Sequence, residues 1–268
     1  MEHVLHRVLA FAASIFPLFL VIFSLQNIPS ASSAPPFVVT GAGYITVNGT
    51  LYIQGGGRLY AQGGLYTDTN VTSAFVSLSL SAPWNDTSPP WKEIGVPSQF
   101  QSRNIFQGLA ATPDRTRLVF WGRFAGRYMY NGTISEPPQN DSLTIFNVLD
   151  NTWSQLTFLT NPEAVAGGSV PVVIDPTSKG LGVLYAPDGC SDSVNIPGMC
   201  QMALDKKKTA LYRMPGGLVP IGVTFFSFVY CTSRKTMLLY GGVGAKNEPN
   251  VSLYEFAASA LTWSLLVS

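Results

Sequence analysis

The sequence predicts an all-β repeat fold, a propeller or a solenoid, and two observations support this prediction. A hairpin turn, a hydrophobic strand and a small-residue stop occur together four times, at intervals of roughly 60 residues. Short β-rich runs alternate with turn-forming residues, and little helical periodicity follows the N-terminal segment. The four copies are VNGTLYIQGG (47–56), TPDRTRLVFWGR (112–123), DPTSKGLGVLYAPDG (175–189) and CTSRKTMLLYGG (231–242).

Each repeat is expected to form four strands. Asn48-Gly49 is the strongest two-residue hairpin signal, while Pro113 and Pro176 preset the backbone for a turn. Glycines after the second strand let the chain turn sharply; the aligned stops are Gly55, Gly122, Ala186 and Gly241. The expected strands are 43–47, 51–53, 74–80 and 91–94; 107–111, 118–121, 142–147 and 152–156; 171–174, 182–185, 210–213 and 218–222; and 225–230, 236–240, 252–256 and 262–266.

Aromatic residues mark the outer strands. Trp153 and Trp263 lie at similar distances after the start of the third strand, and Trp91 takes that place in the first repeat after a longer loop. Aromatics at alternating strand positions are expected to fill the core between neighbouring repeats.

These features resemble the kelch-repeat family, which has a hydrophobic strand ending in Gly-Gly, an aromatic third strand and a tryptophan in the fourth. Gly55-Gly56 and Gly241-Gly242 match the doublet, whereas the second repeat has Gly122-Arg123 and the third has Ala186-Pro187. The third repeat also has Leu218 near the tryptophan position. The resemblance implies a kelch-type β-propeller from Pro36 onward, similar to the propellers of galactose oxidase and of fungal secreted or membrane-anchored kelch proteins.

The propeller is expected to occupy residues 35–268, with blades at about 36–97, 98–160, 161–222 and 223–268. Kelch propellers usually have more than four blades, and a ring must close to remove its sheet edges. We therefore expect the ring to be incomplete in these residues; closure of four blades alone is the alternative.

The N-terminal segment, residues 1–34, indicates export. A weakly basic start with His3, His6 and Arg7 precedes the apolar run Val8–Leu25 and a polar, small-residue stretch, as in a secretory signal peptide. An uncleaved signal anchor is the alternative. Six N-x-[ST] sequons then indicate a glycosylated protein, secreted or held at the cell surface. They are Asn48, Asn70, Asn85, Asn131, Asn140 and Asn250.

The chain has three cysteines. Cys190 and Cys200 flank a short loop and are a candidate disulfide in an oxidising compartment. Cys231 is expected to be a buried, unpaired residue, with a partner outside the chain as the alternative.

Composition argues against nucleic acid as a partner. The formal net charge is +1, and charged residues make up 12% of the chain, so no basic stripe exists. The densest basic cluster, Lys206-Lys207-Lys208, is interpreted as a solvated loop.

Enzymatic chemistry finds little support. The galactose oxidase propeller implies a copper site with histidine ligands, but both histidines, His3 and His6, lie in the leader. A copper, His-ligated zinc or Ser-His-Asp site needs an imidazole, so we expect no catalytic residue, metal or cofactor. Aspartates lie mostly in turns; calcium binding at Asp188 and Asp192 is a weaker hypothesis.

The predicted function is a non-catalytic, extracellular binding module for a protein or a glycan. Its binding face is expected on the loops that follow the second strands. One alternative is the propeller part of a galactose oxidase-like copper enzyme, and another is a cell-surface receptor-like protein, with the remaining parts beyond Ser268. Membrane attachment would come only from an uncleaved leader or such a C-terminal segment. The candidate binding residues are Arg58, Tyr60, Tyr66, Arg123, Arg127, Tyr128 and Tyr130.

Overall fold

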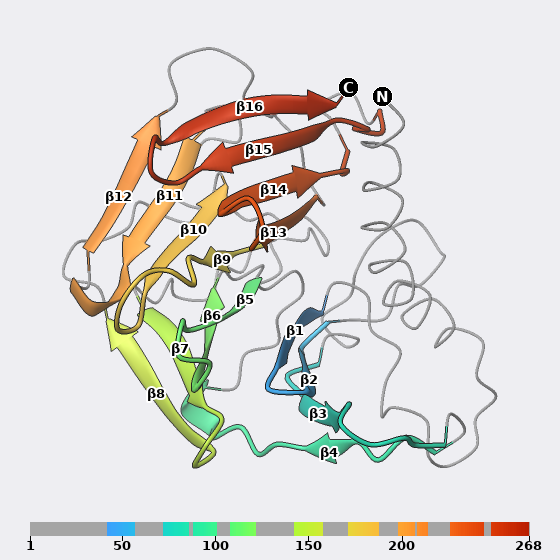
Figure 1. Cartoon of the computed structure of the whole chain (residues 1–268). Coiled ribbons are helices and arrows are strands. Elements are labelled where there is room, and N and C mark those ends of the chain that lie inside the picture. Colours follow the sequence, from blue (N-terminus) through green and yellow to red (C-terminus); the bar gives the residue numbers. More distant parts are fainter. Residues whose placement is uncertain are drawn as a thin grey trace, which may run out of the picture.

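The computed structural model (Figure 1) describes residues 42–56, 72–85, 88–100, 108–121, 142–157, 171–187, 198–206, 208–213, 226–243 and 248–267. In these residues the chain forms four antiparallel sheets of four strands each, in sequence order. Two short 3₁₀ helices, η3 (Ser98–Phe100) and η4 (Leu204–Lys206), are the only helical elements of this part of the chain. The all-β prediction is confirmed.

Each sheet is a four-stranded meander. The first sheet contains β1 (Gly43–Val47), β2 (Thr50–Gln54), β3 (Phe75–Ser79) and β4 (Lys92–Glu93). The second contains β5 (Gly108–Ala111), β6 (Arg117–Trp121), β7 (Ser142–Asn147) and β8 (Thr152–Thr157). The third contains β9 (Val173–Ile174), β10 (Val183–Pro187), β11 (Gly198–Ala203) and β12 (Lys208–Arg213). The fourth contains β13 (Ser227–Cys231), β14 (Thr236–Tyr240), β15 (Leu253–Ala257) and β16 (Thr262–Val267).

Figure 1 shows the sheets arranged around a common centre, with the first strand of each sheet innermost and the fourth outermost. The innermost strands contact one another in chain order, β1 with β5, β5 with β9 and β9 with β13. Sheets repeated around an axis in this way form a β-propeller arrangement. We call the sheets blades 1 to 4.

The hairpin turns follow from their sequences. Asn48 and Gly49 have φ angles of 49° and 73°, as a tight two-residue turn requires at both central positions. Arg115 and Lys235 also have positive φ, 56° in each case, in the longer first hairpins of blades 2 and 4. The Asn48 side-chain amide donates to the Arg115 carbonyl across 3.2 Å, so these turns connect blades 1 and 2.

An aromatic core joins blades 1 and 2. Phe75 and Phe146 are fully buried, with ring centroids 5.0 Å apart in an edge-to-face arrangement. Trp153 packs on Phe146 with centroids 4.9 Å apart, and its indole N–H donates to the Gly95 carbonyl across 3.0 Å. Each such ring pair contributes about 0.5–1.5 kcal/mol beyond its area burial. The predicted role of the alternating aromatics is confirmed here.

Strand alternation assigns the two faces of each blade to different neighbours. In β6, Leu118 and Phe120 pack toward blade 1, whereas Val119 and Trp121 pack toward blade 3. A further core, which includes Phe256, joins blades 3 and 4. Among the described residues, no hydrophobic core joins blade 4 to blade 1.

The structure corrects the expected strands of the third repeat. The segment 210–213, predicted as the third strand, belongs to the outermost strand β12, and the third strand is instead β11. β11 contains Cys200 and pairs with β10, so the chain forms a ladder strand where the sequence predicted a loop. The predicted stop position of the third repeat was also wrong. Equating Ala186 with Gly122 would place Tyr185 at the position of Trp121, but the ladders place Pro187 there.

Several predictions lie outside the described residues. These include the signal peptide in residues 1–34, the segment 218–222 and the hypothetical calcium residues Asp188 and Asp192. Within the described ranges, no helix has the length and apolar character needed to cross a membrane.

Candidate interaction surfaces

The repeated topology gives the propeller two structurally different rims. The second strands β2, β6, β10 and β14 hold the same place in every blade and end at one rim, which we call the loop rim. The hairpin turns between first and second strands, and between third and fourth strands, lie at the opposite rim, which we call the turn rim.

The predicted binding residues fall in segments that leave from the loop rim. All seven lie outside the described residues: Arg58, Tyr60, Tyr66, Arg123, Arg127, Tyr128 and Tyr130. What the structure describes is where these segments begin. The two segments follow Gly56 and Trp121, in neighbouring blades that share a core.

At the turn rim, three aspartates are occupied by their own turns. The Asp114 carboxylate accepts the Thr112 hydroxyl at 2.6 Å, and Asp150 accepts the Thr152 hydroxyl at 2.6 Å. Asp175 accepts the Thr177 hydroxyl at 2.7 Å. These hydroxyl bonds lower the pKa values of Asp114 and Asp150. The three aspartates therefore support turn geometry, as their sequence context predicted.

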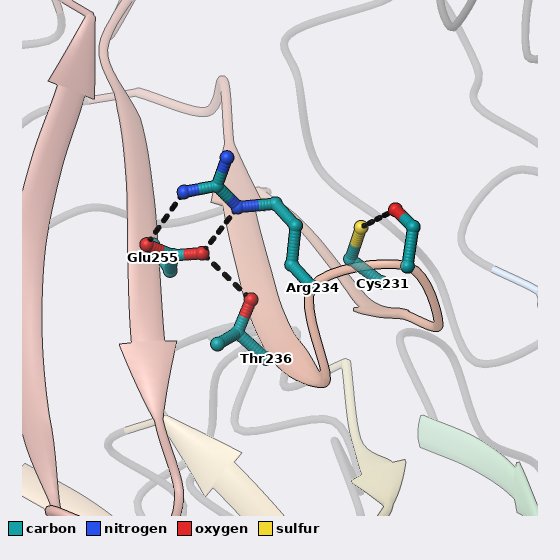
Figure 2. Close-up of polar contacts among 5 residues, drawn as sticks. Cys231, Arg234, Thr236 and Glu255 are labelled. Carbon is teal, nitrogen blue, oxygen red and sulfur yellow. Dashed lines mark hydrogen bonds and ion pairs between the residues drawn. The ribbon is translucent and has the colours of Figure 1, made fainter.

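A polar group lies on the outward face of blade 4 (Figure 2). The Arg234 guanidinium donates to both carboxylate oxygens of Glu255, from Nε at 2.6 Å and from Nη2 at 3.1 Å. The Thr236 hydroxyl donates to the same carboxylate at 2.7 Å. The bond from Arg234 lowers the pKa of Glu255, and the same contact raises the pKa of Arg234. Glu255 is therefore held as an ionised carboxylate whose negative charge is balanced by Arg234.

This pair was not predicted from the sequence. The sequence does contain a signal for Glu255. Glu255 and Leu253 are two residues apart and share one face of β15, so a charged residue occupies a position that is apolar in the equivalent strand of blade 2. Assigning Arg234 as its partner required the register of the sheet, since the two residues come from different hairpins.

The cysteines divide into two classes. Cys231 is a free thiol, half-buried at the end of β13, with its sulfur 3.4 Å from the Ser233 hydroxyl. Cys200 is fully buried and takes part in a disulfide. Its expected partner, Cys190, lies outside the described residues.

Three of the six predicted glycosylation residues are described. Asn85 is exposed between β3 and β4. Asn48 is also exposed, but its amide donates to Arg115. Asn250 is half-buried, and its amide donates to the Gly241 carbonyl across 3.0 Å. Asn70, Asn131 and Asn140 lie outside the described residues.

Buried polar atoms offer little to a ligand. The indole N–H groups of Trp91, Trp121 and Trp263 and the Gln54 side-chain oxygen are buried without a hydrogen-bond partner. They are distributed over blades 1, 2 and 4. In the described ranges, no three His, Cys, Asp or Glu side chains cluster in a way that could hold a metal ion.

Comparisons with known proteins do not add a family assignment. A scan against protein-family models and a search of curated proteins gave no match.

Proposed function

We propose that this chain is an exported, kelch-type propeller that binds an extracellular protein or glycan without catalysing a reaction. The observation that carries the proposal is the common topology of the four blades. Because of it, the segments that contain the candidate arginine and tyrosine residues begin at the same rim, the loop rim. Repeat folds of this kind present surfaces, and their function depends on the residues placed there.

Local geometry supports the kelch resemblance. Gly55 and Gly56 have φ angles of 66° and 92°, and Gly241 and Gly242 have 76° and 95°. Only glycine adopts such angles readily, so the doublets are required where these second strands end. Trp263 packs on Phe256 in blade 4, as Trp153 packs on Phe146 in blade 2.

The residue types of the loop rim suit a polar ligand with flat surfaces. Tyrosine side chains can stack on sugar rings or anchor a protein interface, and arginine donates several hydrogen bonds in a fixed geometry. The turn rim offers less, because its described aspartates are already bonded within their turns.

The test is a binding experiment with two sets of alanine variants. One set replaces Arg58, Tyr60 and Tyr66, and the other replaces Arg123, Arg127 and Tyr128; Lys179→Ala, an exposed change at the turn rim, is the control. The purified protein is screened on a glycan array and against a panel of extracellular proteins. Ligands found by either screen should be lost with both sets and kept by the control.

Two results would contradict the proposal. One is a ligand whose binding is unaffected by both loop sets. The other is stoichiometric copper binding with oxidation of a primary alcohol, which would favour the galactose oxidase-like alternative.

A further inference from the structure

The outward face of blade 4 is an apolar sheet surface without a neighbour among the described residues. We call it the open face and define it by Val229, Leu238, Tyr240, Leu253 and Val267, with Glu255 among them. Val229, Tyr240 and Val267 are 40%, 56% and 52% exposed. In the described parts of the chain no inter-blade core includes these residues.

The open face has the same construction as an occupied face elsewhere in the molecule. Aligning the ladders of blades 2 and 4 equates Val119 with Leu238 and Trp121 with Tyr240. In the outermost strands Leu156 corresponds to Val267, because Leu156 pairs with Leu143 and Val267 pairs with the equivalent residue Leu253. In blade 2 these residues pack on blade 3 and are at most 8% exposed. The open face therefore has the side-chain pattern of a surface that packs on another blade.

Glu255 does not prevent such packing. The equivalent positions in blades 1 and 3 are also polar, Ser77 and Gln201. Ser77 is 9% exposed, and Gln201 donates to the Tyr185 hydroxyl across 2.8 Å within its blade. Because Arg234 and Thr236 already satisfy the Glu255 carboxylate, covering this face would not leave an unpaired charge.

The complementary surface is present on blade 1. In blade 2, Leu109, Leu118 and Phe120 pack on the preceding blade. The ladder of blade 1 places Tyr44, Leu51 and Ile53 at the equivalent positions. Tyr44 is 43% exposed, and Leu51 and Ile53 are half-buried.

We propose that the open face of blade 4 binds the Tyr44 face of blade 1 in a second copy of this chain. The contact continues the series already formed between blades 1 and 2, 2 and 3, and 3 and 4. Two such contacts related by a two-fold axis would place eight blades around one centre, within the usual range of about 4–8 for propellers. Both ends of the blade series are then covered.

The first test measures the oligomeric state by sedimentation equilibrium over a range of protein concentrations. The unmodified protein should form a dimer, and Tyr240→Lys and Tyr44→Lys should each weaken it about tenfold or more, since each puts a charge into an apolar contact. Leu149→Lys, at a 71% exposed position in the turn between β7 and β8, is the matched control and should leave the dimer intact. Circular dichroism and thermal melting establish that each variant is folded.

A mixing experiment tests which faces meet. Tyr240→Lys retains an intact blade 1 face, and Tyr44→Lys retains an intact blade 4 face, so an equimolar mixture can form one unaltered contact. The mixture should associate more strongly than either variant alone. A mixture that stays as dissociated as the separate variants would show that these faces do not pair.

Other results overturn the proposal directly. The protein could remain monomeric at every concentration, or form a dimer that Tyr240→Lys does not weaken. Hydroxyl-radical footprinting that finds Tyr240 protected in a monomer would indicate that another segment of the same polypeptide covers the open face.

Discussion

The face of blade 2 that packs on blade 3 and the outward face of blade 4 are built from equivalent strands but have different surroundings. Their registers agree except at the end of the outermost strand, where blade 4 has a shift of one residue. Val119 and Trp121 are 0% and 4% exposed, whereas Leu238 and Tyr240, at the equivalent positions, are 7% and 56% exposed. The two faces differ at the centre, where Ile145 in blade 2 corresponds to Glu255 in blade 4. The comparison shows that the alternation of a blade strand specifies a packing surface whether or not that surface has a neighbour.

Because their surroundings differ, equivalent side chains on the two faces contribute differently to the free energy of unfolding. In blade 2 the side chains stabilise the fold by leaving water against another blade. In blade 4 most of the same side chains still contact water, so in a single molecule they contribute much less. Substitutions at matched positions measure this difference.

The largest effect is expected for Trp121→Ala. Loss of the indole leaves a cavity between blades 2 and 3 and should reduce the free energy of unfolding by about 3–5 kcal/mol. Tyr240→Ala, at the equivalent exposed position, should cost less than about 1 kcal/mol. Urea denaturation, at a concentration where both variants are monomeric, measures both values. Equal losses would mean that the two faces have the same surroundings.

Two glycines extend the comparison to the backbone, Gly182 at the contact between blades 2 and 3 and Gly241 at the end of β14 in blade 4. Gly182 has a φ of 95°, and a Cβ there would lie 2.6 Å from Ile174 Cγ2 and 3.1 Å from Pro113 Cδ in blade 2. Gly182→Ala should therefore cost about 2–4 kcal/mol from backbone strain and overpacking. Gly241 has a φ of 76° but no atom within 4 Å of an added Cβ. Gly241→Ala should therefore reduce the free energy of unfolding only through the strain of a left-handed backbone conformation, by about 1–2 kcal/mol. Thermal melting of both variants provides the comparison.

The smallest effect is expected for Glu255→Gln, which removes the charge at the centre of the open face. The Arg234 side chain is 52% exposed, so the pair should contribute about 0.5–1 kcal/mol at neutral pH. Because folding lowers the pKa of Glu255, this contribution exists above the carboxyl's ordinary pKa and disappears as the pH falls through the folded value. Stability curves for the protein and the variant should therefore converge in acid.

The control for this prediction is Glu93→Gln, the same chemical change at an exposed position of β4. Its stability curve should follow that of the unmodified protein at all pH values. A constant difference between Glu255→Gln and the unmodified protein down to acid pH would show that the Arg234 contact does not depend on the carboxylate charge.

Much of the fold could be predicted from local sequence. The strands Gly43–Val47, Ser142–Asn147 and Thr236–Tyr240 have the predicted bounds, because strong turn residues limit alternating apolar runs at both ends. The third repeat failed for the same reason. Gly198 lies next to Pro197 and close to Cys200, and these residues favour a loop locally, yet the segment forms β11 because Met199 and Met202 are buried by packing on neighbouring blades.

The interaction surfaces were less predictable. The continuous apolar run in TMLLY shows that both faces of β14 are apolar, because successive side chains of a strand point to opposite faces. It does not show which face packs on another blade. That assignment depends on contacts between residues more than 50 positions apart, such as Tyr185 with Phe256. The loop-rim residues remain predictions, since they lie outside the described residues.

If the chain is exported and glycosylated as proposed, the bond from Asn48 to Arg115 links glycosylation of this residue to the packing of blades 1 and 2. An N-linked sugar is joined to the same amide nitrogen that donates across this blade contact, and it leaves that nitrogen with one hydrogen. In a glycosylated molecule, the contact would form only if the sugar projects away from blade 2 and the remaining hydrogen points at the Arg115 carbonyl. Sugar transfer at Asn48 and closure of the first two blades would then compete for one atom, so whichever process is faster would determine the occupancy of this sequon.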